Sequence, residues 1–416
     1  MKKILLAFII FTTSSSALLA NGEDSVLTPA DSLPQGITIP YDSLLTGWFA
    51  KNYLKFTDED KIEVPTSELS DSVYADRLWR IPSVMEMPYN PIVRQYIDLY
   101  TGSKMRAKVS FMLGAMNFYI SIFEEALDAY GLPDELKYLP VIESALNPNA
   151  VSRAGASGLW QFMMKTGKIY GLQSNSLIDE RRDPIKSTYA AARYLKDLYG
   201  IYGDWSLVIA AYNCGPGNVN KAINRAGGAN DYWEIYNYLP RETRGYVPSF
   251  IAANYVMNYY CMHNIVPMQA ELPLLTDTVL VDKELHLGQI ADFCQTDIEM
   301  LRALNPQYKK DILPGHSREC ILRLPQDKIA MFVQNDDSIY NHKHDEFFKK
   351  RRYVTVKENT RSNSRASKNA TYHKIRSGET LSTIARKYGV SVNNLKRWNN
   401  LKNSRINAGK RLRVSP

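Results

Sequence analysis

Apolar residues recur at steps of three and four positions from about Asn90 to Met262, the spacing that places them on one face of an α-helix. The clearest runs are Ile92, Tyr96, Ile97 and Tyr100, then Met112, Met116, Tyr119, Ile120 and Phe123. The pattern predicts a large helical domain, which we expect over residues 90–265.

Local chemistry marks where individual helices begin and end. Asp183, followed by a proline, predicts a helix start, because its carboxylate can accept hydrogen bonds from free N–H groups and proline fits the first turn. Asp204 similarly precedes an apolar segment that a Gly-Pro-Gly turn should end. Tyr212 and Asn213 are therefore expected at a helix end, where side chains can point into a cleft.

The chain outside this domain has a different composition. Residues 21–89 show no sustained period and predict an extended N-terminal arm, whereas residues 327–371 are polar and charged and predict a linker. Residues 372–416 contain two amphipathic helices, Leu381 to Tyr388 and Val392 to Trp398, between short apolar flanks. They predict a compact C-terminal unit.

A degenerate copy of this unit is expected over residues 275–326. At an offset of 94 residues, Leu301 falls on Leu395, Asn305 on Asn399 and Gly315 on Gly409. The shared helix faces and turns indicate an internal repeat.

The first 20 residues predict a cleaved signal peptide. Lys2 and Lys3 precede an apolar run of about eight residues, which is too short for a bilayer, and small residues follow near Ala17 to Ala20. No cysteine near this site could accept a lipid. We therefore expect a periplasmic or cell-envelope protein without a transmembrane helix after cleavage.

Charge changes the expected partners. The formal net charge is +8, or +6 without Lys2 and Lys3, and much of the surplus lies in the linker and the C-terminal unit. In an exported protein this favours an anionic envelope polymer over nucleic acid. A loose association with the envelope stays open, and a monomer is expected.

Four cysteines in an exported chain are candidates for disulfides. Cys294 is expected on the first helix of the degenerate repeat and Cys320 just before its closing strand, so these two are predicted to pair. The cysteine spacing is unlike that of a zinc ribbon and the histidines are scattered. No metal and no cofactor is predicted.

Candidate chemistry centres on Glu143. It follows Pro140, Val141 and Ile142, near the end of a helix that Asn147-Pro148 must end. Apolar surroundings disfavour the charged form of a carboxyl group and raise its pKa toward the value that a general acid needs at neutral pH.

Four motifs in order give Glu143 its context. They are Glu143-Ser144, Gly158-Leu159-Trp160-Gln161, Ala211-Tyr212-Asn213 and Tyr246. Together they resemble the lytic murein transglycosylase family, whose catalytic domain has a goose-lysozyme-like fold, and the C-terminal unit resembles a LysM domain, a βααβ module that binds glycans containing N-acetylglucosamine. The resemblance implies an α+β chain, mainly α, in which a lysozyme-like helical domain precedes a degenerate LysM-like repeat and a LysM domain.

The resemblance also implies residue roles. Glu143 would be the catalytic acid and base, with Tyr212 hydrogen-bonded to it. Tyr246 would line the cleft. The residues expected to bind substrate are Ser144, Ser152, Gln161, Met163, Asn213 and Tyr246.

Glycoside hydrolysis usually takes two carboxylates, and the motifs offer only one. A family member would instead use the C6 hydroxyl of N-acetylmuramic acid as an internal nucleophile and leave 1,6-anhydro ends. Two alternatives stay open: a muramidase that uses water with Asp179, Glu180 or Asp183, and a non-catalytic peptidoglycan-binding scaffold. Asp183 is expected to be a helix cap.

Overall fold

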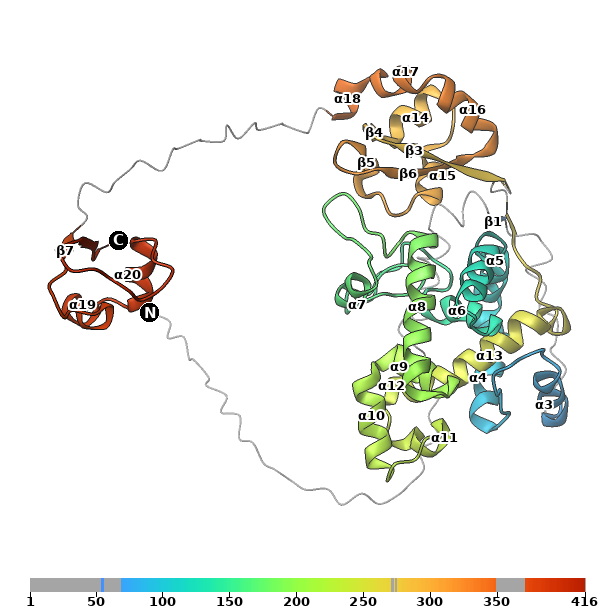
Figure 1. The fold of residues 1–416 in the computed structure, drawn as a ribbon. Coiled ribbons are helices and arrows are strands. Elements are labelled where there is room, and N and C mark those ends of the chain that lie inside the picture. Colours follow the sequence, from blue (N-terminus) through green and yellow to red (C-terminus); the bar gives the residue numbers. More distant parts are fainter. Residues whose placement is uncertain (1–53, 56–68, 271–272, 274, 349–370, 416) are drawn as a thin grey trace, which may run out of the picture. The chain divides into compact units, whose positions relative to one another are not determined.

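The computed structural model describes residues 54–55, 69–270, 273, 275–348 and 371–415. The chain divides into two compact units, residues 1–349 and 350–416, which are considered separately (Figure 1). The predicted signal peptide, most of the predicted arm and residues 349–370 of the predicted linker lie outside the described residues. Within the described ranges, no helix is both long and apolar enough to cross a membrane.

The first domain, residues 69–270, is built from helices. Its main helices are α3 (Asp71–Trp79), α4 (Pro91–Thr101), α5 (Ser103–Ala129), α6 (Leu139–Ser144), α8 (Pro184–Tyr202), α9 (Trp205–Cys214), α10 (Pro216–Arg225) and α13 (Tyr246–Tyr259). Shorter turns are η3 (Asp134–Tyr138), α7 (Met164–Ile169), α11 (Tyr232–Ile235), η4 (Tyr236–Tyr238), α12 (Arg241–Arg244) and η5 (Tyr260–His263). The predicted starts at Asp183 and Asp204 are confirmed, because both carboxylates accept backbone N–H groups at the first turns of α8 and α9.

Helix α13 forms the centre of this domain. Every residue from Tyr246 to Met257 is buried, and the helix packs against α4, α9 and α6. A helix that is apolar on all sides must be surrounded by other elements. The first residue of α13 is thereby fixed beside the end of α6.

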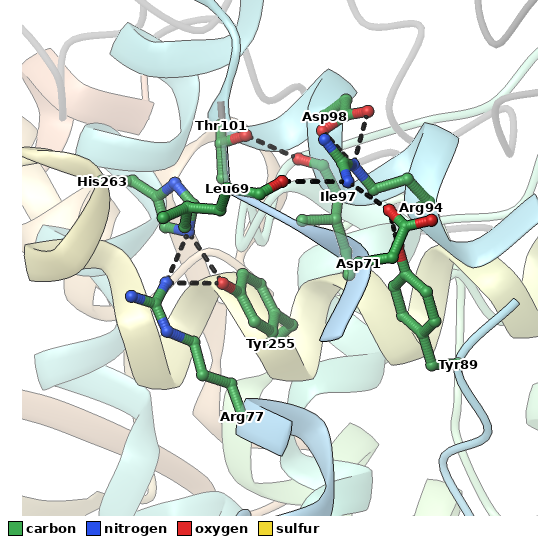
Figure 2. Close-up of polar contacts among 10 residues, drawn as sticks. All are labelled: Leu69, Asp71, Arg77, Tyr89, Arg94, Ile97, Asp98, Thr101, Tyr255 and His263. Carbon is green, nitrogen blue, oxygen red and sulfur yellow. Dashed lines mark hydrogen bonds and ion pairs between the residues drawn. The ribbon is translucent and has the colours of Figure 1, made fainter. Parts of the chain in front are cut away.

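The prediction of an extended arm is wrong for residues 71–79, which form α3. Tyr74 and Leu78, one turn apart, are buried against the first domain. Arg77 donates a 2.9 Å hydrogen bond to the hydroxyl of Tyr255 on α13, and His263 lies 2.9 Å from the same hydroxyl (Figure 2). The stripe of two apolar residues is too short to show helical periodicity in the sequence.

The second domain, residues 275–348, contains two small antiparallel sheets. Strand β3 (Thr276–Val281) pairs with β6 (Cys320–Pro325), and β4 (Glu284–His286) pairs with β5 (Ile312–Pro314). Helices α14 (Leu287–Phe293) and α15 (Ile298–Leu304) and turns η6 (Lys309–Asp311) and η7 (Gly315–Ser317) lie between the strands. A further pair joins β1 (Leu54–Lys55) to β2 (Gln269–Ala270).

The predicted linker is wrong for residues 327–348. These residues form most of α16 (Gln326–Gln334) and all of α17 (Asp336–Asn341) and α18 (His344–Phe348), along one side of the second domain (Figure 1). Phe332 and Ile339 are buried in that domain's core. Fully buried Gln289 on α14 donates to the carbonyl oxygens of residues 339, 340 and 342. Burial of scattered apolar side chains outweighs the polar composition of this segment.

The C-terminal unit has the predicted βααβ order. Strand β7 (Tyr372–Lys374) pairs with β8 (Arg411–Arg413), and α19 (Leu381–Tyr388) and α20 (Val392–Trp398) lie between them. Asn399 donates to the carbonyl oxygen of Arg413 and accepts from its N–H. Asn305 makes the same pair of bonds with Arg323, so the internal repeat extends to hydrogen bonding. The closing strands align at an offset of 90, however, because Arg413 corresponds to Arg323, so Gly315 is not the counterpart of Gly409.

The predicted disulfide is not formed. All four cysteines are free thiols, and both Cys294 and Cys320 are buried. Cys320 lies on β6, where its thiol is 3.6 Å from the carbonyl oxygen of Arg318. Cys294 ends α14 instead. The sequence placed both cysteines in the repeat, but it could not show whether their thiols are close enough to bond.

Candidate active site

Glu143 stands on the last turn of α6, where the chain reverses sharply. Ala145 and Leu146 both adopt left-handed backbone conformations, with φ of 49° and 61°. Such conformations are costly for residues other than glycine. Leu146 is fully buried, and this burial helps to hold the reversal that ends α6 immediately after Glu143.

The carboxyl group of Glu143 lies in apolar surroundings although part of the side chain stays accessible. Its neighbours in the chain, Val141 and Ile142, have no exposed surface. Burial raises the pKa of Glu143 from 4.5 to about 7, against the opposing effect of a hydrogen bond from Tyr246. At neutral pH a large fraction of Glu143 therefore carries a proton that it can donate.

The hydrogen bond to Glu143 comes from Tyr246 and not, as predicted, from Tyr212. The hydroxyl of Tyr246, at the start of α13, donates to Oε1 of Glu143, and its ring is fully buried. The hydroxyl of Tyr212 donates instead to the carbonyl oxygen of Trp160 at 2.8 Å. Both tyrosines lie at ends of helices that meet near α6, and their sequence spacing could not distinguish these two acceptors.

Ser144 is fully buried, so the prediction that it contacts substrate is wrong. Its hydroxyl lies 3.1 Å from the carbonyl oxygen of Pro140 and 2.9 Å from that of Leu159. Ser144 therefore ties the end of α6 to the segment that carries Gln161.

That segment, residues 155–162, is called the Gln161 turn below. Ser157 and Phe162 exchange backbone hydrogen bonds of 3.1 and 3.2 Å across it. Gln161 has a φ of 46°, and its side-chain amide donates to the carbonyl oxygen of Gly158 at 2.8 Å. A Cβ on Gly158 would lie 1.8 Å from the carbonyl oxygen of Arg181, so only glycine fits there.

The remaining predicted substrate-binding residues keep accessible surface. Met163 is 45% exposed, and Asn213 is exposed with its side-chain oxygen accepting from Thr243 at 3.0 Å. Ser152 is half-buried and its hydroxyl accepts from the N–H of Ala156. Glu143, Gln161 and Tyr212 are also partly accessible. The Gln161 turn and the ends of α6 and α9 are joined by the bonds from Ser144 and Tyr212.

The three acids that could support a hydrolytic mechanism are all engaged in the structure. Asp179 forms a two-point ion pair with Arg181, and Glu180 pairs with Lys186 and Arg318. Burial opposes ionisation of both acids, yet the bonds from these cations lower their pKa values below the ordinary range. Asp183 caps α8, as predicted.

Sequence reasoning missed Arg181, which is 6% exposed. Its guanidinium donates to the carbonyl oxygens of Gly155 and Phe162, at both ends of the Gln161 turn. From the sequence, the segment Asp179 to Pro184 is notable only for its acids, as alternative catalytic groups and as a helix cap. A run of charged residues between two apolar segments was the available signal that these charges could be buried together.

Three domain families match the sequence. Residues 121–235 match the transglycosylase SLT domain, residues 275–341 match the LysM-like domain of lytic transglycosylase MltD, and residues 373–415 match the LysM domain. The chain carries a transglycosylase SLT domain and two LysM-type domains. Glu143, the Gln161 turn and Tyr212 lie within the matched SLT range, whereas Tyr246 lies beyond it.

Individual relatives agree with these matches. The chain is 33% identical over 288 residues to membrane-bound lytic murein transglycosylase D of Escherichia coli (strain K12), which covers 68% of this chain and 60% of the relative. It is 33% identical over 124 residues to soluble lytic murein transglycosylase of the same strain, covering 28% of this chain and 19% of that protein. The chain thus spans at most about three fifths of the length of these relatives.

A solved structure is also similar to part of this chain. The crystal structure of the 70 kDa soluble lytic transglycosylase from Escherichia coli is 29% identical, with a TM-score of 0.30, over 35% of this chain and 24% of that chain. The predicted fold class is confirmed: a mainly α SLT domain precedes LysM-type domains with small antiparallel sheets.

Proposed function

We propose that this chain is a lytic transglycosylase that cleaves the β-1,4 bond between N-acetylmuramic acid and N-acetylglucosamine in peptidoglycan. The observation that carries the proposal is a single carboxyl group, that of Glu143, held in apolar surroundings with its pKa raised to about 7. The SLT domain match and the identity to lytic murein transglycosylases support the same reaction.

Glu143 acts twice in the proposed mechanism. As an acid it gives its proton to the bridging oxygen, and the bond from that oxygen to the anomeric carbon of N-acetylmuramic acid breaks. The 2-acetamido group stabilises the cationic carbon. The C6 hydroxyl of the same sugar then attacks this carbon and passes its proton to the Glu143 carboxylate, which leaves a 1,6-anhydro end and restores the acid.

The internal nucleophile makes a second carboxylate unnecessary. A hydroxyl held within the same sugar has an effective concentration far above that of a diffusing reactant, which favours ring closure over attack by water. The engagement of Asp179, Glu180 and Asp183 supports this mechanism over a hydrolytic one, because each is already paired or capping.

Tyr246 has a positioning role in this proposal. Its hydroxyl holds Oε1 of Glu143, so Oε2 is the atom assigned to both proton transfers. Gln161, Met163, Asn213 and Ser152 provide the accessible surface on which sugar rings would bind. The substrate-binding set proposed here therefore omits Ser144 and Tyr246, which are buried.

Export and tethering complete the proposal. The predicted signal peptide would direct the chain to the periplasm or the cell envelope. The C-terminal LysM domain would bind peptidoglycan glycan strands and keep the SLT domain close to its substrate.

Mass spectrometry of the fragments released from purified sacculi tests the proposal. Fragments ending in 1,6-anhydro-N-acetylmuramic acid are the expected products. Reducing ends would instead identify a muramidase that uses water, and no release at all would identify a binding scaffold.

A further inference from the structure

The SLT and LysM-like domains share a hydrophobic core at one loop. This loop, residues 173–183, is called the docking loop and leads into α8. Its Ile178 is 2% exposed and belongs to the same hydrophobic core as Leu285 and Leu313 of the LysM-like domain. An apolar side chain of one domain that completes the core of another makes the two pack as one body.

Backbone hydrogen bonds fix the docking loop to the segment after α15. The N–H of Lys309 donates to the carbonyl oxygen of Leu177 at 2.7 Å, and the N–H of Asp179 donates to the carbonyl oxygen of Gln307 at 2.8 Å. Ile178 and Tyr308 form a β-bridge between them. Two backbone hydrogen bonds therefore join the docking loop to the LysM-like domain.

Arg318 adds a charged contact at the same place. Its guanidinium donates to the side-chain oxygen of Gln173 at 2.8 Å and to Oε1 of Glu180 at 2.7 Å. The Glu180 side chain is only 4% exposed, while that of Arg318 is 28% exposed. An ion pair with one desolvated partner depends more strongly on its geometry than an exposed pair does.

The docking loop also holds the Gln161 turn. Arg181 uses Nε and one terminal nitrogen for Asp179 within the loop, at 2.9 and 2.8 Å. Its other terminal nitrogen donates to the carbonyl oxygens of Gly155 at 2.8 Å and Phe162 at 3.0 Å. The turn is in addition packed closely on the loop backbone at Gly158.

The Gln161 turn in turn contacts the helix that carries Glu143. The hydroxyl of Ser144, next to Glu143, reaches the carbonyl oxygen of Leu159, and Tyr212 reaches that of Trp160. A continuous series of contacts thus leads from Arg318 and Ile178 through Arg181 and the turn to Glu143.

We propose that the LysM-like domain is a brace for the SLT active site, which it holds through Ile178 and Arg318 on the docking loop and through Arg181 on the Gln161 turn. These three are positioning residues, because none is placed on the reacting atoms. The catalytic consequence rests on the proposed function, whereas the mechanical consequence does not. Sites built on loops keep their geometry only when a supporting layer of contacts fixes them.

Arg318→Ala in the full chain tests the brace, with Arg302→Ala as a matched control. Arg302 forms ion pairs with Glu299 and Asp311 inside the LysM-like domain. Hydrogen exchange of the amides of Ser157 and Phe162 is measured together with kcat and KM on short soluble glycans. Arg318→Ala should speed hydrogen exchange in the Gln161 turn. It should also lower kcat roughly 3- to 10-fold with little change in KM, because a misplaced Gln161 turn and Glu143 would affect mainly the chemical step.

Two further variants sharpen the result. Arg318→Lys keeps a cation beside Glu180 and should recover part of both effects, while Ile178→Ala should reproduce them through the apolar contact. Exchange or kcat in Arg318→Ala equal to that of the wild type and of Arg302→Ala would overturn the brace. If the wild type cleaves no glycan, the proposed function fails, and the exchange comparison alone then decides for or against the brace.

Discussion

At Glu143, burial and a hydrogen bond act on the same carboxyl group in opposite directions. Burial in apolar surroundings raises the pKa to about 7, and the bond from Tyr246 lowers it. The proposed general-acid step needs the protonated form of Glu143. The chemistry of the site is thus set by how far this one group is desolvated and by one tyrosine hydroxyl.

The pH profile of cleavage should show this balance. Because the acid form of Glu143 is lost as the pH rises through about 7, kcat/KM on soluble glycans should fall above that value. Tyr246→Phe removes a bond that favours the carboxylate, so it should move this fall to higher pH and lower the activity. Tyr212→Phe, whose hydroxyl contacts Trp160 instead, should lower activity without moving the fall. An identical shift in both variants would contradict the assignment of Tyr246 to Glu143.

Single residues were predictable where one motif fixed their role. The apolar residues before Glu143 were enough to predict a raised pKa, and the structure agrees. The partner of Glu143 was not predictable, because Tyr212 and Tyr246 lie in helices whose packing decides which hydroxyl reaches the carboxyl group. Ser144 shows the same limit: its position beside Glu143 suggested substrate, but α6 turns its hydroxyl toward the Gln161 turn.

Among the elements, α3 illustrates how a short helix is held by side-chain contacts. Arg77 reaches Tyr255 on α13 and lies 3.5 Å from His263. Tyr74 packs on the same tyrosine and histidine rings, and the guanidinium of Arg94 lies over the ring of Tyr74. Arg94 also pairs with Asp71 and Asp98 (Figure 2). The cluster joins α3 and α4 to the far end of the helix that begins at Tyr246.

His263 should make this cluster sensitive to acid. Burial, followed by the charges of Arg77 and Arg106, lowers its pKa from 6.5 to about 4. The unfolded chain therefore binds a proton that the folded chain excludes, and the stability present above pH 6.5 is lost as the pH falls toward 4. The loss should approach about 3 kcal/mol, from the free-energy equivalent of the pKa difference. Urea unfolding at pH 7 and pH 4.5 measures it, and His263→Gln should show a shallower loss; an equal loss in both proteins would contradict this role.

Elements with complete local signals were predicted almost to the residue. Helices α19 and α20 follow capping residues Thr380 and Ser391 and carry regular apolar faces, and their predicted bounds are confirmed. Helices α16 to α18 were missed because their buried residues, Phe332 and Ile339 among them, are separated by charged positions. Only the second domain's core makes these segments helical.

At the scale of the whole molecule, helices α16 to α18 decide where the chain should be cut to remove the LysM domain. Ending the chain after Gln326 would delete α16 to α18 and expose the apolar core that they cover. Ending it after Lys349 removes only the second compact unit. The shorter deletion therefore removes the proposed tether and keeps the LysM-like domain that is proposed to brace the active site.

Removal of residues 350–416 should weaken binding to intact sacculi and leave cleavage of short soluble glycans nearly unchanged. A tethered binding module raises the effective substrate concentration, which can increase overall avidity by about 10²- to 10⁴-fold without changing the reaction itself. Co-sedimentation with sacculi and kcat on soluble glycans measure the two effects. Equal losses on both substrates would indicate that the LysM domain belongs to the active site.

The organisation of the whole chain was largely predictable, since four ordered motifs and an internal repeat indicated the domain families. The contact between the SLT and LysM-like domains was not. Ile178 and Arg318 lie 140 residues apart in the sequence, and neither belongs to a motif. Such contacts depend on which surfaces of the two domains meet, and one sequence alone carries no signal for that.

Glu143→Gln tests the central claim most directly. Glutamine keeps the shape of the side chain but can neither protonate the bridging oxygen nor accept the proton of the C6 hydroxyl. Each proton transfer is typically worth about 10² to 10⁴ in rate, so release of 1,6-anhydro fragments from purified sacculi should fall to or below detection while circular dichroism and sacculus binding stay close to wild type. Substantial release of anhydro fragments by a folded Glu143→Gln protein would contradict the single-acid mechanism.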